Sequence, residues 1–314
     1  MNGLKAHPIH QGYLLGLDLG GTRFKALALT QEGKIIARET VPSDGSTWQT
    51  VVKSCVSGLT SRLGKPLAMG VSAPGLVAAD QRSISQMPGR LPGLEGLDWT
   101  QFLQANNIVT VLNDGQAALL GEVWMGAAKG ATDVFLLTLG TGVGGAILSG
   151  GRLLRGHLGR AGHLGHITVN AGGLPDIVNT PGSLEDAVGN HSILTRSQGR
   201  YSTTHALVAD VARGEANAIE IWNFTIRDLA AGIVSLVNVL DPGLVLIGGG
   251  IAEAGDALFV PLALALDRME WRPSGYRVRL AHAQLGDWAG AHGAAWQAWQ
   301  ALQALPSPAH PSTP

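Results

Sequence analysis

Stretches with the hydrophobic pattern of strands alternate with stretches of helical spacing along most of the chain. Near the N-terminus, strand-like runs at 13–18, 24–30 and 35–41 follow one another with short turns between them, and they predict an antiparallel meander. Later apolar runs predict strands at 67–72, 108–112, 134–139, 145–148, 244–247 and 277–281. Helical spacing predicts helices at 47–63, 115–126, 216–240 and 291–302, with one more after Ile251. The pattern is that of an α/β protein.

The same pattern divides the 314 residues into two lobes, in keeping with the usual domain size of roughly 100 to 200 residues. We expect a small N-terminal lobe of 13–112 plus 291–304 and a large lobe of 113–290. The ends, 1–12 and 305–314, contain prolines and few core-forming residues, and we expect them to be flexible.

Residues 151–190 are rich in glycine, histidine and proline and show little periodicity. Long irregular segments of this kind often carry function. We therefore expect substrate contacts within this segment.

Composition and charge exclude several classes of protein. Hydrophobic residues make up 45% and charged residues only 14% of the chain, as in a folded globular protein. The net charge of −1, without a basic run, argues against a nucleic-acid or membrane partner and favours a small-molecule ligand. The lone Cys55 permits neither an intramolecular disulfide nor a thiolate metal site. No signal-peptide or membrane-spanning pattern is evident, so we expect a cytoplasmic protein.

Glycine-rich turns follow two of the predicted strands, at Asp18-Leu-Gly-Gly-Thr22 and Leu139-Gly-Thr-Gly-Val-Gly-Gly145. Glycine lacks a Cβ, so its backbone N–H groups can approach an anion closely and form a phosphate cradle. Either turn alone is more often an ordinary hairpin turn, whereas the pair predicts a split site that grips one triphosphate. A third glycine run, Gly248–Gly250, follows a buried-type strand and precedes a helix.

Taken together, the motifs of the chain resemble those of the ROK family of repressors, open reading frames and sugar kinases. The resemblance covers nearly the whole folded body and rests on Asp18–Thr22 with Lys25, Ala73-Pro-Gly75, Asn113-Asp114, Leu139–Gly145, Gly162-His-Leu-Gly-His166, Gly182-Ser-Leu-Glu185 and Val245–Gly250. It implies an actin-like or hexokinase-like ATPase fold, related to ribonuclease H, with two lobes around a nucleotide and sugar cleft. It also implies a homodimer.

The activity that the resemblance implies is ATP-dependent, glucokinase-like phosphoryl transfer to the 6-hydroxyl of a hexose or N-acylhexosamine, with Mg²⁺. Asp114 is then the general base, and Asp18 holds Mg²⁺ directly or through water. The nucleotide contacts implied are Asp18, Gly20, Gly21, Thr22, Lys25, Gly140, Thr141, Gly142, Gly144, Gly248, Gly249 and Gly250. The sugar-side positions are Asn113, Asp114, His163, His166, Glu185 and Arg90. Read alone, Asp114 is a helix cap and Asp18 a partner of the turn backbone.

Two features depart from the family pattern on the sugar side. His163 stands where relatives usually have a glutamate, and a neutral imidazole accepts one hydrogen bond where a carboxylate accepts several. Arg90 stands where relatives tend to have an asparagine, and it favours an anionic substrate unless it is an ordinary surface arginine. These changes leave the choice of sugar open.

The zinc site of the family is a third departure. Its pattern has three cysteines after the Gly-His motif, and here Ser183 stands in the place of the last one while 171–180 contains no thiolate. We therefore expect no structural zinc, because such sites take four nitrogen or sulfur ligands. A three-histidine site of His157, His163 and His166 is the weaker alternative.

Other functions stay open beside the kinase. The altered sugar side favours a catalytically weak sugar or nucleotide sensor as the main alternative. A repressor of the same family would carry a helix-turn-helix before the kinase body, and only about a dozen residues precede Tyr13. Polyphosphate in place of ATP as donor has no supporting stripe of basic residues.

Overall fold

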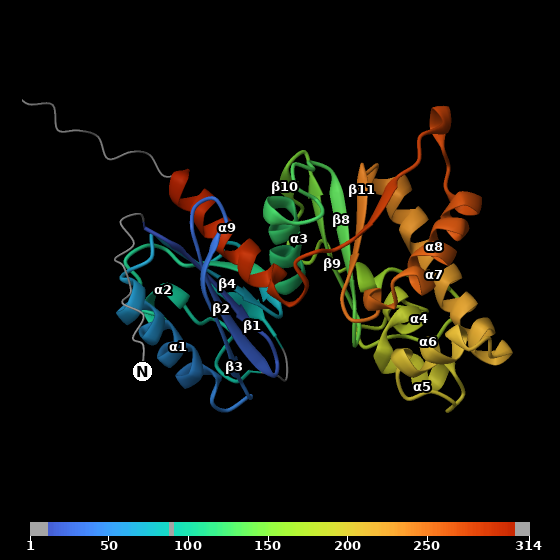
Figure 1. Cartoon of the computed structure of the whole chain (residues 1–314), viewed down its shortest axis with the longest axis horizontal. Helices are drawn as coiled ribbons and strands as arrows, with labels where there is room; N and C mark the ends of the chain where they lie inside the picture. The colour runs from blue at the N-terminus through green and yellow to red at the C-terminus, as the bar shows by residue number, and fades with distance from the viewer. Residues whose placement is uncertain (1–11, 88–90, 305–314) are drawn as a thin grey trace, which may run out of the picture. The chain divides into compact units, whose positions relative to one another are not determined.

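The computed structural model describes residues 12–87 and 91–304, and these form two compact units (Figure 1). The first unit holds the described residues up to Met125 and those from Asp287 onward, and the second holds 126–286. Each unit is built around one five-stranded sheet.

The sheet of the first unit has the strand order β3-β2-β1-β4-β7. The predicted meander is confirmed as β1 (Leu14–Leu19), β2 (Arg23–Leu29) and β3 (Ile35–Pro42), with antiparallel pairing throughout. The strands β4 (Ala68–Ala73) and β7 (Thr110–Asn113) continue the sheet parallel to β1. The carboxyl ends of β1, β4 and β7 therefore lie at one edge of the sheet.

Alternation along β1 and β2 sends side chains to two different helices. One face packs on α1 (Trp48–Leu63), and the opposite face packs on α9 (Ala289–Gln303). Leu15 and Leu17 lie in the α1 core, and Leu14 lies in the α9 core. Asp18 shares the face of Leu14 because strand side chains repeat every two residues.

The helix α3 (Asp114–Met125) packs against α9, with Trp124 and Trp296 stacked at a centroid distance of 5.0 Å. The helix α3 thus belongs to the first unit, whereas the sequence pattern placed the boundary between the lobes before it. The difference arises because α9, which comes last in the chain, supplies the surface that α3 covers.

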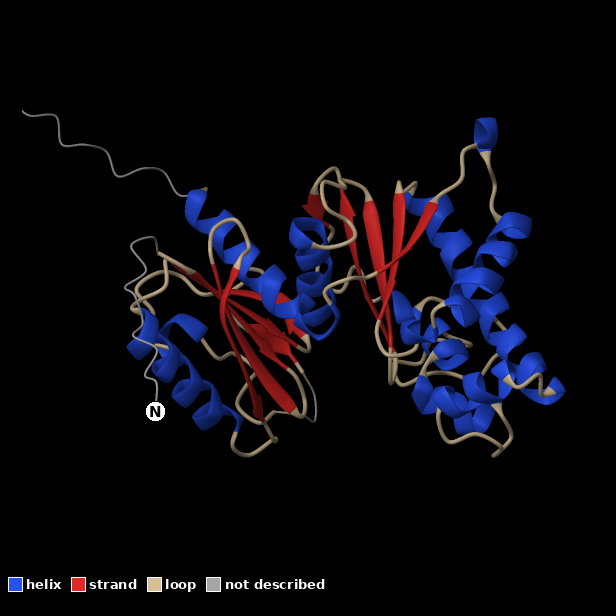
Figure 2. Cartoon of the chain, viewed as in Figure 1, coloured by secondary structure: helices blue, strands red, loops and turns tan. Residues whose placement is uncertain are grey.

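The sheet of the second unit has the order β10-β9-β8-β11-β12. Its strands are β8 (Val134–Leu139), β9 (Val143–Ser149), β10 (Arg152–Leu153), β11 (Leu244–Gly248) and β12 (Arg279–His282). Figure 2 shows helices gathered beside this sheet, namely α4 (Leu184–Val188), α5 (Ile193–Arg196), α6 (Thr204–Ala212), α7 (Ala216–Leu240) and α8 (Asp256–Met269). The helix α7 is long and apolar enough to span a membrane by composition, but its Leu229 and Ile233 are completely buried in the core of this unit.

Short elements complete the chain. They are β5 (Leu76–Val77), β6 (Ile84–Gln86), α2 (Trp99–Phe102), and the 3-10 turns η1 (Leu164–His166), η2 (Asn190–Ser192), η3 (Ala252–Ala254), η4 (Pro273–Gly275) and η5 (Gly286–Trp288). In the segment expected to be irregular, β10, η1 and α4 are regular elements, and the stretches between them are irregular. The sequence pattern missed α6, although Thr203 caps it by accepting a hydrogen bond from Ala206 N–H.

Candidate active site

Asp18 lies at the carboxyl edge of the first sheet, beside two polar neighbours. Ser72 stands next to it on β4, and the Ser72 hydroxyl donates a hydrogen bond of 2.7 Å to Oδ1 of Asp18. Lys25, its partner on β2, brings Nζ within 3.6 Å of Oδ2 and donates to the carbonyl of Asp287. The edge thus combines one carboxylate with one cation.

The surroundings of Asp18 disfavour its charge. Burial raises the pKa of Asp18, the hydrogen bond from Ser72 and the charge of Lys25 oppose this rise, and the nearby Asp114 carboxylate adds to it. A Cβ added to Gly290, in the first turn of α9, would lie 2.7 Å from Oδ1, so only glycine leaves room for the carboxylate. A half-buried carboxylate beside a second carboxylate fits the oxygen ligands that Mg²⁺ prefers.

Asn113 and Asp114 lie at the junction of β7 and α3, on the same sheet edge. The Asn113 side chain donates to the carbonyl of Gly75 (3.0 Å) and accepts from Gly115 N–H (3.0 Å), so its amide is fixed in orientation. Oδ1 of Asp114 also accepts from Gly115 N–H, at 2.8 Å, and the residue is exposed. The Asp114 carboxylate is therefore tied to the first turn of its helix and is also accessible to a ligand. One carboxylate in this position can serve both as a helix cap and as a base.

The first glycine turn is open to solvent. Gly20 N–H donates to the carbonyl of Arg23 (3.0 Å), whereas Gly21 and Thr22 are exposed. Apart from its chain neighbours, no atom of residues 12–87 and 91–304 lies within 4 Å of a Cβ built on Gly21. The space beside Gly21 can therefore be occupied by a ligand.

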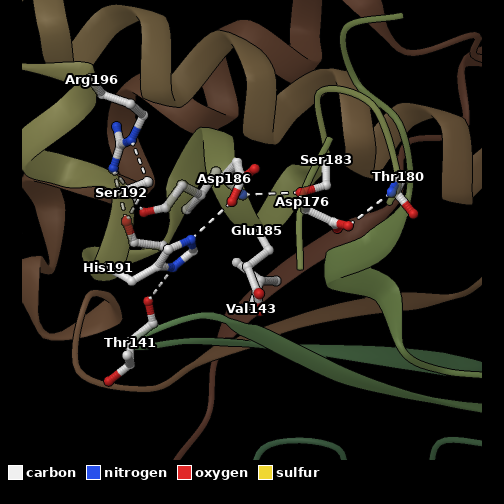
Figure 3. A network of polar contacts seen from close by, with 12 residues as sticks. Thr141, Val143, Asp176, Thr180, Ser183, Glu185, Asp186, His191, Ser192 and Arg196 are labelled. Carbon is white, nitrogen blue, oxygen red and sulfur yellow. Dashed lines mark hydrogen bonds and ion pairs between the residues drawn. The ribbon is translucent and has the colours of Figure 1, made fainter. Parts of the chain in front are cut away.

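A carboxylate lies against the second glycine turn, which joins β8 to β9. Oε2 of Glu185, from α4, accepts a hydrogen bond of 2.9 Å from Val143 N–H (Figure 3). A Cβ added to Gly142 would overlap with this carboxylate. Thr141 is exposed at the tip of the turn, whereas Gly144 lies within β9 opposite Thr138. The structure thus brings a residue predicted for the sugar to a turn predicted for phosphate.

His191 is a further contact of this turn that the sequence pattern did not indicate. Its Nδ1 lies 2.9 Å from the carbonyl of Thr141, and its Nε2 lies 2.9 Å from Oδ1 of Asp186 (Figure 3). Both partners are acceptors, so both ring nitrogens must donate, which requires the imidazolium. Burial lowers the pKa of His191, but the bonds to Asp186 and Thr141 and the charges of Glu185 and Asp186 outweigh it, and the net shift is upward.

A cavity of about 610 Å³ lies between the second turn, the third glycine motif and α6. Its lining includes the predicted Gly140, Thr141 and Gly250. The lining that the sequence pattern missed consists of Asn190, Thr203, Thr204, His205, Val208, Ala209, Ala212, Ile251, Glu253 and Ala254. Gly248 ends β11, and Ile251 N–H donates to the carbonyl of Leu139, which holds the third motif beside the end of β8. Its lining combines the apolar side chains of Val208, Ile251 and Ala254 with polar side chains such as Thr204 and His205, as small-molecule sites do.

The histidines of the irregular segment have separate partners. Nδ1 of His163 lies 2.9 Å from the carbonyl of Arg160, and Nδ1 of His166 lies 2.8 Å from Oδ2 of Asp176. His157 is exposed. Over 12–87 and 91–304, no three His, Cys, Asp or Glu side chains are grouped as metal ligands. The expectation for Arg90 lies outside the described residues.

The predicted site residues thus gather in two groups. Asp18, Lys25, Asn113 and Asp114 lie along one sheet edge of the first unit. In the second unit, Glu185 meets the second turn, and the third glycine motif shares a cavity with that turn.

This arrangement, with a glycine turn after the first strand of each sheet, is the actin-like ATPase fold. The chain belongs to the ROK family, whose family model matches residues 14–301. It is 31% identical to a glucokinase of Halalkalibacterium halodurans, over 90% of this chain and 94% of that protein. It is 30% identical to an N-acetylmannosamine kinase of Escherichia coli, over 90% of this chain and 96% of that protein. A ROK glucokinase from Streptomyces griseus, solved with glucose and AMPPNP, superposes with a TM-score of 0.75 at 26% identity, covering 92% of this chain and 100% of the other.

Proposed function

We propose that the chain is an ATP-dependent sugar kinase that transfers the γ-phosphoryl group to the 6-hydroxyl of a hexose or N-acylhexosamine. The observation that carries the proposal is the exposed Asp114 carboxylate beside the fixed Asn113 amide and the half-buried Asp18. Phosphoryl transfer needs a base next to the acceptor hydroxyl and a cation near the phosphates, and we assign these roles to Asp114 and Asp18. Relatives named glucokinase and N-acetylmannosamine kinase support the sugar class.

In the proposed reaction, the 6-hydroxyl oxygen attacks the γ-phosphorus of ATP. The new O–P bond forms as the bond to the β-phosphate oxygen breaks, and ADP leaves. Asp114 accepts the hydroxyl proton, and Asn113, held by Gly75 and Gly115, positions the acceptor. Asp18 would hold Mg²⁺, which would supply charge neutralisation at the phosphates when bound.

The nucleotide is assigned to the glycine turns and the second-unit cavity. Gly20 N–H and Gly140 N–H already donate within their turns, so the backbone N–H groups of Gly21, Thr22, Thr141 and Gly142 would hold the phosphates. The adenosine part would enter the cavity against Gly250 and α6. Lys25, which already lies 3.6 Å from Asp18, would add positive charge.

The sugar side rests on His166 and Glu185, with His163 and Arg90 as the positions that distinguish this chain. Nδ1 of His163 faces the Arg160 carbonyl and must donate to it, so the neutral ring offers one acceptor where a glutamate would offer several. This observation favours a catalytically weak sensor as the second candidate function. A homodimer and a cytoplasmic location remain part of the proposal, on the family resemblance.

A coupled ADP-release assay with Mg-ATP tests the proposal. The panel would contain glucose, mannose, N-acetylglucosamine, N-acetylmannosamine, fructose and allose. We expect turnover with at least one sugar, and Asp114→Asn should lower kcat by roughly 10²- to 10⁴-fold without changing ATP affinity. Turnover that survives in Asp114→Asn would refute the base. Silence across the panel, with ATP binding demonstrated, would favour the sensor.

A further inference from the structure

The buried carboxylate of Asp176 lies at the centre of the irregular segment that carries His166. Its Oδ1 accepts hydrogen bonds from the N–H groups of Val178 (2.9 Å) and Thr180 (2.8 Å), and its Oδ2 lies 2.8 Å from Nδ1 of His166. The hydroxyl of Ser183 adds a further hydrogen bond. These five residues are the Asp176 cluster, of which Figure 3 labels Asp176, Thr180 and Ser183.

The cluster supplies hydrogen bonds to the Asp176 carboxylate, whose side chain is 0% exposed. Burial alone would raise the pKa of Asp176, but the hydrogen bonds from His166, the two backbone N–H groups and Ser183 outweigh it and lower the pKa. The group is therefore a stable anion at neutral pH. An uncompensated carboxylate would be costly at this depth.

The same side chains do not fit zinc. A structural zinc takes four nitrogen or sulfur ligands, whereas here one imidazole nitrogen, a serine hydroxyl and a carboxylate are available. Oδ1 of that carboxylate is already engaged by two N–H groups, and Cys55 lies on α1 of the first unit. The side chains of this segment are hydrogen-bonded to one another and to backbone N–H groups, so they do not form a set of zinc ligands.

The bond between Asp176 and His166 fixes the state of the imidazole. A carboxylate only accepts, so Nδ1 of His166 must donate to it. The neutral ring then carries no proton on Nε2, which is free to accept from a hydroxyl. In the part of the chain that the structure describes, Nε2 has no hydrogen-bond partner, and the side chain is 27% exposed.

The cluster also anchors the start of α4, which carries Glu185. The Ser183 hydroxyl caps this helix by accepting from Asp186 N–H at 3.2 Å. Leu184 N–H donates to the carbonyl of Ile167, directly after His166 in the chain. Two of the three predicted sugar contacts of the second unit, His166 and Glu185, are therefore tied to Asp176 through one or two hydrogen bonds.

We propose that Asp176 is a positioning residue that does without metal what a zinc ion would do in this segment, by orienting Nε2 of His166 toward a sugar hydroxyl and joining His166 to the helix that carries Glu185. This inference rests on the proposed sugar kinase function. It predicts a protein that binds sugar through a carboxylate-fixed histidine and that needs no zinc for its fold.

A double-mutant cycle on His166→Gln and Asp176→Asn tests the coupling. Each single variant should raise KM for the sugar by about 10-fold, while kcat changes by less than about threefold. If Asp176 acts through His166, the double variant should also show about a 10-fold rise, whereas independent effects would multiply to about 100-fold. A multiplied effect, or an unchanged KM in Asp176→Asn, would overturn the proposal.

Asp133→Asn is the matched control. Asp133 also accepts backbone and hydroxyl hydrogen bonds in the second unit, from Gly150 N–H and Ser149, but it lies at the other end of β8 and β9. The Asp133→Asn substitution should leave KM for the sugar and KM for ATP unchanged. If Asp176→Asn fails to fold, Ser183→Ala removes one bond of the cluster and should raise KM for the sugar by a few-fold.

Metal analysis provides a readout that does not depend on activity. The purified protein should hold well below one zinc per chain, and a zinc-selective chelator should leave its Tm unchanged. Stoichiometric zinc, or a lower Tm with the chelator, would refute the metal-free role. Lack of turnover with every sugar would instead count against the kinase, and the zinc and Tm results would still decide the role of Asp176 in the fold.

Discussion

Each unit has a carboxylate near its glycine-rich turn, and each carboxylate lies against a glycine. The two carboxylates differ in the groups that donate hydrogen bonds to them. Asp18 comes from the strand that precedes its turn, and it occupies the space that a Cβ on Gly290 would fill. Glu185 comes from α4, far along the chain, and it occupies the corresponding space at Gly142. Glu185 accepts a backbone hydrogen bond from its turn, whereas Asp18 bonds only to side chains among the contacts described above.

The difference shows how each carboxylate can be used. Burial raises the pKa of Asp18 because few hydrogen-bond donors replace the water that the carboxylate loses. A bound cation would therefore interact strongly and favourably with this carboxylate. Glu185 instead stabilises the shape of the turn, and its remaining acceptor sites are available for hydroxyls. The carboxylate of Asp18 is thus short of hydrogen-bond donors, whereas the carboxylate of Glu185 is held by the backbone of its turn.

The largest effect should come from Asp18→Asn. Because the pKa of Asp18 is higher in the folded than in the unfolded protein, the folded state binds more protons between these two pKa values. Stability from this group therefore falls as pH rises from the ordinary value of 3.8 through the folded value. The variant should escape this loss and show a Tm a few degrees higher at pH 7 without Mg²⁺.

The same variant should lose function. We expect kcat with Mg-ATP to fall by about 100-fold or more, because a neutral amide holds Mg²⁺ poorly. Calorimetric melting from pH 4 to 8 and steady-state kinetics measure the two effects. A variant that is both less stable and fully active would contradict the role of Asp18 in the first turn.

A second comparison uses alanine at one glycine of each turn. Gly21→Ala adds a methyl group in open space, so Tm should stay unchanged while KM for ATP rises by about 10-fold, since the methyl blocks a phosphate. Gly142→Ala displaces the Glu185 carboxylate and its bond to Val143, which should cost about 1 kcal/mol of stability. It should also raise KM for the sugar by several-fold. Thermal melts and kinetics with each substrate varied measure these effects. A higher KM for the sugar in Gly21→Ala, or a higher KM for ATP alone in Gly142→Ala, would contradict the assignment of the two turns.

The smallest expected effect is the pH dependence of the second turn. His191 has a pKa raised in the folded state, so its contribution is fully present below about pH 6.5 and is lost as pH rises through the folded value. The neutral ring can donate to only one of Thr141 and Asp186. KM for ATP should therefore rise by two- to threefold between pH 6.5 and 8.5.

His191→Gln should give a flat profile over the same range, because an amide does not titrate there. His157→Gln, at an exposed position of the irregular segment, is the control and should keep the wild-type profile. Identical profiles in the wild type and His191→Gln would show that His191 does not hold the turn.

The local pattern of the chain was sufficient for most elements of both sheets. The meander, the strand before Asn113 and the long helix α7 all follow from short-range hydrophobic spacing. The glycine motifs and Asn113-Asp114 likewise stood out because their residue types and spacing are informative within a few positions. These features depend on neighbours along the chain, and a sequence displays such neighbours directly.

Tertiary structure decided what depends on partners distant in sequence. The helix α3 belongs to the first unit because α9, from the other end of the chain, packs on it. His191 contacts Thr141, fifty residues earlier, through an acceptor that no local pattern marks. Asp176 has an inconspicuous sequence context, and its role comes from folding the irregular segment around one buried charge. A buried carboxylate takes its hydrogen-bond donors from wherever the fold brings them, so these pairings are decided only in the folded chain.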